Sequence, residues 1–165
     1  MVFSSILFLI YALPIFLLGF YCIPAKYRDF WTVTFSLLFY TWGAPEFILI
    51  ALSSSLLDYF IALKIKGNKK LLLLGVLLNV AMLGYFKYTN FLMDNWNQLL
   101  SLLGMQPNNY LKVLLPIGIS FFTFQKISYL VDVYRGDCPP QNRLEKYLLF
   151  IFLFPQLIAG PIIKF

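Results

Sequence analysis

The fold is decided by the opening stretch of the chain, MVFSSILFLIYALPIFLLGFYCIPA (residues 1–25), in which no side chain is charged. A helix rises about 1.5 Å per residue, so this stretch reaches roughly 37 Å and exceeds the ~30 Å hydrocarbon core of a bilayer. A secretory signal would place basic residues before its apolar run, and here Met1-Val2-Phe3 leads straight into it. The stretch therefore predicts a retained membrane span.

The composition extends this interpretation to the whole chain. Hydrophobic residues make up 61% and charged residues 12%, whereas a soluble domain carries about 25% charged residues. The net charge of +6 would favour nucleic-acid binding in a soluble protein, but these basic residues sit in short loops, where they set membrane orientation. We therefore expect a lipid bilayer and no nucleic acid as partner. Histidine is absent, which excludes histidine-based acid–base chemistry and histidine metal sites from these residues.

Charged residues divide the chain into six predicted spans within one membrane domain, residues 1–165. Pro14 predicts a kink in the first span. The second span is short, so its helix either begins inside the preceding loop or lies in a thinned bilayer. Asp58 and Lys87 lie near span ends, where an interfacial location explains them. The spans are residues 3–23, 30–42, 47–63, 71–86, a segment within 111–134, and 147–163. The predicted class is an all-α, polytopic transmembrane helical bundle.

The basic loops predict the orientation. Loop 24–29 holds two basic residues, loop 64–70 holds four and loop 135–146 holds three, whereas the turn at 43–46 holds none and contains Glu46. Cytoplasmic loops carry the excess of lysine and arginine. The expected location is a bacterial inner membrane, with the N-terminus outside and the lysine loop 64–70 in the cytoplasm.

Residues 90–103 differ from the spans because apolar and polar side chains alternate with helical periodicity. Leucines and Trp96 share one face, asparagines and Asp94 occupy the opposite face, and Gly104 and Pro107 are expected to stop the helix. This pattern predicts an amphipathic helix that lies in the membrane interface or packs on the bundle. A role in holding a partner is the alternative.

Residues 115–136, LPIGISFFTFQKISYLVDVYRG, carry the candidate site. Pro116 and Gly118 can bend or break a helix, and non-helical backbone at membrane depth is tolerated where protein buries it or where it lines a cavity. Four polar residues then fall on one helical face at spacings of 3, 4 and 3: Gln125, Ser128, Asp132 and Arg135.

This polar stripe has two interpretations. It can brace the helix near the cytoplasmic interface, with Asp132 and Arg135 spaced so that they could pair. Alternatively, the four residues line a substrate passage, because an acidic side chain within a span usually faces the protein interior or water. Asp58 and Asp132 are the carboxylates inside the predicted spans, and neither shows an evident basic relay partner in the sequence.

Five motifs occur in order along the chain. They are residues 1–5 (MVFSS), 35–42 (FSLLFYTW), 83–91 (LGYFKYTNF), 115–136 and 154–162 (FPQLIAGPI). In this order the chain resembles the N-terminal part of a membrane-bound O-acyltransferase, in the branch of alginate O-acetyltransferase membrane subunits and related polysaccharide acetylases. The resemblance covers nearly the whole chain.

The resemblance implies a many-helix membrane fold with a funnel or tunnel. It implies transfer of acyl groups from a cytoplasmic donor, acetyl-CoA, to an extracytoplasmic polysaccharide such as alginate, with extracytoplasmic acetyltransferase partners. The family's signature catalytic histidine lies in the later half of the protein. We therefore expect no catalytic residue, bound cofactor or metal in this chain, and we expect an N-terminal fragment or truncated gene product that is inactive alone.

A second hypothesis is a non-enzymatic membrane subunit, either a scaffold or part of a transport path. The absence of histidine favours it for the isolated 165 residues, whereas the ordered motifs favour an acyltransferase for the parent protein. The reading frame after Phe165 separates the two hypotheses. Further spans and histidines there would favour the enzyme, and a stop codon would favour the subunit.

Overall fold

The computed structural model describes residues 6, 8–116 and 118–155. These residues form helices and no strand, which confirms the all-α class. The α-helices are α1 (Leu13–Cys22), α2 (Arg28–Gly43), α3 (Ile48–Lys64), α4 (Lys69–Leu102), α5 (Ile119–Arg135) and α6 (Leu144–Phe152). A π-helical turn, Phe8–Ala12, precedes α1, and 3₁₀ turns at Ala25–Tyr27 and Pro45–Phe47 precede α2 and α3.

Local chemistry explains where several of these helices begin and end. The Asn68 side chain accepts hydrogen bonds from the Lys70 and Leu71 amides and caps the start of α4. Gly136 ends α5 with a φ of 83°, a left-handed conformation that other residues rarely adopt. Helix α2 begins at Arg28, inside the predicted loop, which is one of the two alternatives for its short apolar run.

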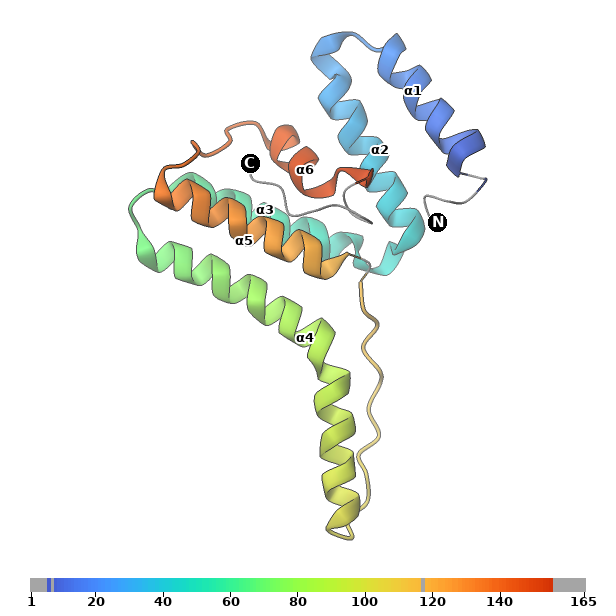
Figure 1. Ribbon diagram of the computed structural model, residues 1–165, viewed down its shortest axis with the longest axis vertical. Coiled ribbons are helices and arrows are strands. Elements are labelled where there is room, and N and C mark those ends of the chain that lie inside the picture. The colour runs from blue at the N-terminus through green and yellow to red at the C-terminus, as the bar shows by residue number, and fades with distance from the viewer. Residues whose placement is uncertain (1–5, 7, 117, 156–165) are drawn as a thin grey trace.

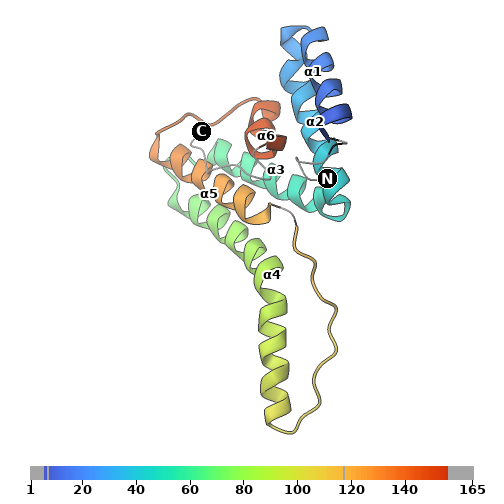
Figure 2. The same ribbon diagram turned by 45° about the vertical axis from the view of Figure 1, so that its right-hand side comes forward.

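The centre of the molecule is a layer in which α3, α5 and the first half of α4 lie side by side (Figures 1 and 2). Helix α6 packs against α2, α3 and α5, and α1 contacts α2. Glycines permit close approach between helices, as is common in membranes. A Cβ atom at Gly75 would lie 2.7 Å from the Leu130 side chain, and one at Gly19 would overlap the Trp31 ring.

Aromatic rings fill the junction between α1, α2 and the end of the described chain. The rings of Phe8, Phe16, Phe35 and Phe39 all contact that of Phe154, at centroid distances of 5.1 to 5.9 Å. Interhelical van der Waals packing of this kind is a main source of helix association in lipid. It places the N-terminal helix against the segment that follows α6.

Among the residues that the structure describes, two helices are long and apolar enough to cross a membrane, Pro45–Lys64 with 20 residues and Lys69–Leu102 with 34. These two helices support membrane association, and the prediction of six spans stays a prediction. The predicted span 3–23 contains a shorter apolar helix, Ile10–Cys22, and residues 156–163 of the predicted sixth span lie outside the described residues. The helix expected within 111–134 begins at Ile119, because Pro116 lacks an amide donor and Gly118 has a φ of 74°.

The predicted amphipathic helix at 90–103 is not a separate element. It is the second half of α4, which extends beyond the central layer with an extended segment beside it (Figures 1 and 2). The amide side chain of Asn90 both donates to the Val113 carbonyl at 2.7 Å and accepts from the Val113 amide at 2.9 Å. Asn97 makes the same two bonds with Asn108. The polar face of this part of α4 therefore binds the segment that follows the helix. The periodicity of a single helix does not reveal such a contact.

Candidate functional site

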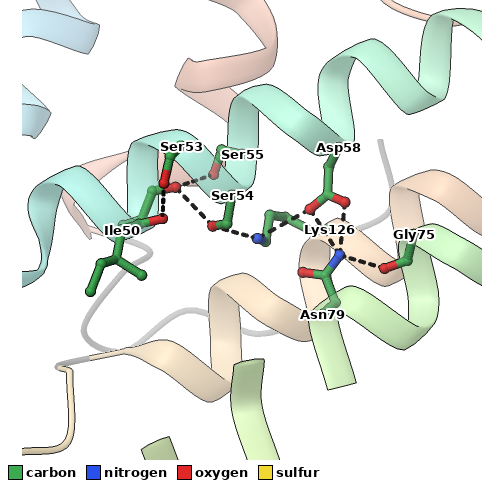
Figure 3. A network of polar contacts seen from close by, with 9 residues as sticks. Ile50, Ser53, Ser54, Ser55, Asp58, Gly75, Asn79 and Lys126 are labelled. Carbon is green, nitrogen blue, oxygen red and sulfur yellow. Dashed lines mark hydrogen bonds and ion pairs between the residues drawn. The ribbon is translucent and has the colours of Figure 1, made fainter. Parts of the chain in front are cut away.

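A buried ion pair between α3 and α5 is the strongest polar feature of the described chain (Figure 3). The Lys126 Nζ lies 3.1 Å from Asp58 Oδ2, and the two side chains are 0% and 3% exposed. Lys126 Nζ also donates to Ser54 Oγ at 2.9 Å. Ser54 lies one helical turn before Asp58 on α3, so both groups approach the same ammonium.

Asn79 brings α4 into this network. Its side-chain amide donates to both carboxylate oxygens of Asp58, at 2.8 and 2.9 Å, and to the Gly75 carbonyl of its own helix at 2.9 Å. Figure 3 shows the Asp58 carboxylate between Lys126 and Asn79. One carboxylate therefore links all three helices of the central layer.

Electrostatics explains why these residues must act together. A charge removed from water is costly unless it is paired and hydrogen-bonded, and losing one partner of a buried pair typically destabilises by about 3–5 kcal/mol. Here the carboxylate has a lysine and an amide as partners, and the ammonium has a carboxylate and a hydroxyl. The network therefore favours one register of α3, α4 and α5 over alternatives that would separate the charges.

The space beside the network is too small for a sugar or an acyl group. A cavity of about 30 Å³ lies against Ser54, Asp58 and Asn79. Ligand sites usually measure 300–1,000 Å³, whereas one water needs roughly 10–15 Å³ of such space. The network of Ser54, Asp58, Asn79 and Lys126 is therefore suited to bracing helices and not to holding a substrate.

The predicted stripe on α5 lies on another face of the helix. Gln125 is 4% exposed and donates to the Phe150 carbonyl of α6 at 2.6 Å. Asp132 is 7% exposed, and the Ser128 hydroxyl donates to it at 3.5 Å. Arg135 is exposed, and no ion pair joins it to Asp132 within the described residues. Whether the four residues line a passage stays a prediction.

The structure corrects the sequence-based interpretation of Asp58. The sequence predicts an interfacial location without an evident basic partner, but the residue is buried and paired with Lys126. Lys126 was missed because it follows Gln125 directly, about 100° around the helix and off the stripe. Opposite charges within two predicted spans were the available signal, since intramembrane charges tend to pair with one another.

Comparisons with known proteins now bear on the whole chain. No family model matches it, and no solved structure matches it. It is 42% identical to the protein named probable alginate O-acetylase AlgI of Pseudomonas aeruginosa, over 100% of this chain and 33% of that protein. The corresponding protein of Azotobacter vinelandii is 41% identical, over 100% of this chain and 34% of that relative.

A relative named for a different substrate extends the comparison. A peptidoglycan O-acetyltransferase of Helicobacter pylori is 33% identical, over 99% of this chain and 37% of that protein. The chain thus spans about a third of the length of the curated relatives it matches. The matched region is the N-terminal third of the alginate O-acetylases, which are the branch of membrane-bound O-acyltransferases that the five motifs of this chain resemble.

Proposed function

We propose that this chain is the N-terminal part of a membrane O-acetyltransferase that passes acetyl groups from cytoplasmic acetyl-CoA to an extracytoplasmic polysaccharide. The observation that carries the proposal is the identity of 41–42% over the whole chain to proteins named as alginate O-acetylases. Because a peptidoglycan O-acetyltransferase also matches, the acceptor is proposed as a class, with alginate as its best-supported member.

These 165 residues have a structural role in the proposed enzyme. Transfer to a sugar hydroxyl needs a base that takes its proton, and a histidine usually does so near neutral pH. These 165 residues contain no histidine. The proposed base therefore belongs to the remainder of the protein, and the brace of Asp58, Lys126 and Asn79 holds the helices on which that remainder packs.

The setting of the proposed enzyme follows from the basic loops. Loops 24–29, 64–70 and 135–146 carry the lysine and arginine excess, which supports an inner-membrane protein with these loops in the cytoplasm. The donor would then approach from the side of these loops. The polysaccharide and any extracytoplasmic acetyltransferase partner would meet the opposite side.

Complementation tests the proposal. In a strain that lacks the full-length protein, we expect the full-length gene to restore ester-linked acetate on the exported polysaccharide. Residues 1–165 alone should insert but restore none, because they contain no histidine. Ester-linked acetate is measured on the purified polymer, and immunoblotting of membranes controls for expression. Acetylation by residues 1–165 alone, or none with the abundant full-length protein, would contradict the proposal.

A further inference from the structure

A groove of about 660 Å³ lies between the beginning of α2 and the beginning of α6, away from the brace. Its volume is within the range of small-molecule sites. Charged side chains stand where both helices begin: Lys26 just before α2, Arg143 just before α6 and Glu145 in the first turn of α6. Two loops that are distant in sequence therefore bring basic side chains to one groove.

The rest of the lining is apolar and follows the helices. Phe30, Val33 and Leu37 line the groove from α2, at spacings of 3 and 4 that place them on one helical face. Leu144 and Leu148 line it from α6, one turn apart. From Lys26 to Leu37 the groove lining covers 11 residue steps, roughly 16 Å at the helical rise. That length suits an extended acyl chain.

Exposed aromatic rings lie near the charged end. Tyr27 is 54% exposed and Phe30 is 66% exposed. Amphipathic aromatic rings, such as that of tyrosine, gather at the level of the lipid headgroups in membrane proteins. The Lys26 ammonium lies 5.7 Å from the centroid of the Tyr27 ring, so the cation and the ring are close enough to face one headgroup together.

We propose that this groove binds an anionic phospholipid, with the phosphate near Lys26 and Arg143 and an acyl chain along α2. Basic pockets between membrane helices are suited to anionic headgroups, and here the charge is confined to one end of an apolar groove. Coenzyme A would also need partners for its adenine and several phosphates, which two basic side chains do not supply. The site is independent of acetyl transfer.

Glu145 offers a further test of the proposal, because its carboxylate competes with the phosphate for Arg143. Its Oε1 lies 2.6 Å from the Arg143 guanidinium, with side-chain exposures of 31% and 51%, so the pair is open to solvent. Exposed ion pairs of this kind are weak. A phosphate can therefore replace the carboxylate as partner of Arg143, and removal of the carboxylate should strengthen binding.

The test uses the full-length protein in nanodiscs of phosphatidylcholine containing phosphatidylglycerol. Native mass spectrometry then counts the lipid retained on release. We expect selective retention of phosphatidylglycerol, a drop of about fivefold for each of Lys26→Gln and Arg143→Gln, and a rise for Glu145→Gln. The matched control, Lys66→Gln with Lys70→Gln, removes two exposed lysines outside the groove and should change retention little.

A variant that fills the groove distinguishes lipid binding in the groove from nonspecific attraction of the lipid to basic side chains. Thr34→Trp adds bulk to the lining without changing charge and should also lower retention. The proposal is overturned if phosphatidylcholine is retained equally, if the control pair lowers retention as much as Lys26→Gln or Arg143→Gln does, or if Thr34→Trp has no effect. Displacement of phosphatidylglycerol by coenzyme A at low concentration would overturn it in favour of a donor site.

Discussion

Helix α5 carries polar side chains on two faces, and the faces differ in what they contact. Lys126 is fully buried and reaches α3 and, through Asp58, α4. On the other face, Gln125 reaches α6, Asp132 is contacted by Ser128 of its own helix, and the series ends at exposed Arg135. A regular polar stripe along one helix is thus a weaker sign of a strong polar contact than opposite charges on two helices.

Removal of the lysine should have the largest effect. Lys126→Met keeps an unbranched side chain but leaves Asp58 buried without its ion-pair partner. We expect a loss of about 3–5 kcal/mol in the free energy of unfolding, measured by equilibrium unfolding in mixed micelles, together with low membrane abundance.

Two variants test that explanation. Lys70→Met removes an exposed lysine from α4 and should change stability little. The double variant Lys126→Met with Asp58→Asn removes both charges and should recover part of the loss, because no unpaired charge remains. Equal losses in the single and double variants would mean that packing, and not charge pairing, distinguishes this face.

Loss of the amide on α4 should have an intermediate effect. Asn79→Leu removes the donor to Asp58 and to the Gly75 carbonyl but leaves the ion pair in place. We expect a loss of about 1–3 kcal/mol on the same unfolding measurement. Asn95→Leu is the matched control, because Asn95 is exposed and bonds to a carbonyl of its own helix. Similar values for the two variants would show that α4 does not depend on the brace.

A change on the second face of α5 should lower the free energy of unfolding by less than the changes at Lys126 and Asn79. Gln125→Met removes the hydrogen bond to the Phe150 carbonyl while nearly keeping the side-chain volume. A neutral hydrogen bond contributes about 0.5–1.5 kcal/mol, and we expect a loss of that size. Gln98→Met on the exposed part of α4 is the control. A loss as large as that of Lys126→Met would remove the distinction between the two faces.

The smallest effect is expected at Asp132. Asp132→Asn keeps the shape of the side chain, and the contact from Ser128 is long at 3.5 Å. We expect stability to change by less than about 1 kcal/mol and polysaccharide acetylation by the full-length protein to stay near normal. The measurement is ester-linked acetate at matched membrane abundance. Acetylation near background with normal abundance would instead identify the stripe as part of a substrate passage.

Much of the fold was predictable because it depends on local pattern. Uncharged runs and their period predicted helices near α2, α3 and α5, and Gly104 marked a helix end. The ends of α5 and α6 and the continuity of α4 were less predictable. Apolar composition alone does not separate a spanning helix from a shorter helix preceded by non-helical chain, as residues 111–116 demonstrate.

The sequence by itself determined the apolar helical class, the asymmetry of basic loops and the five motifs that resemble the O-acetylases, because each depends on residue type and order. The tertiary structure decided which polar groups meet. The pairing of Asp58 with Lys126 joins residues 68 positions apart, and Asn90, inside α4, bonds to Val113 in the segment that follows that helix. Such contacts form because buried charges and amides must find partners, and helix packing determines which partners are within reach.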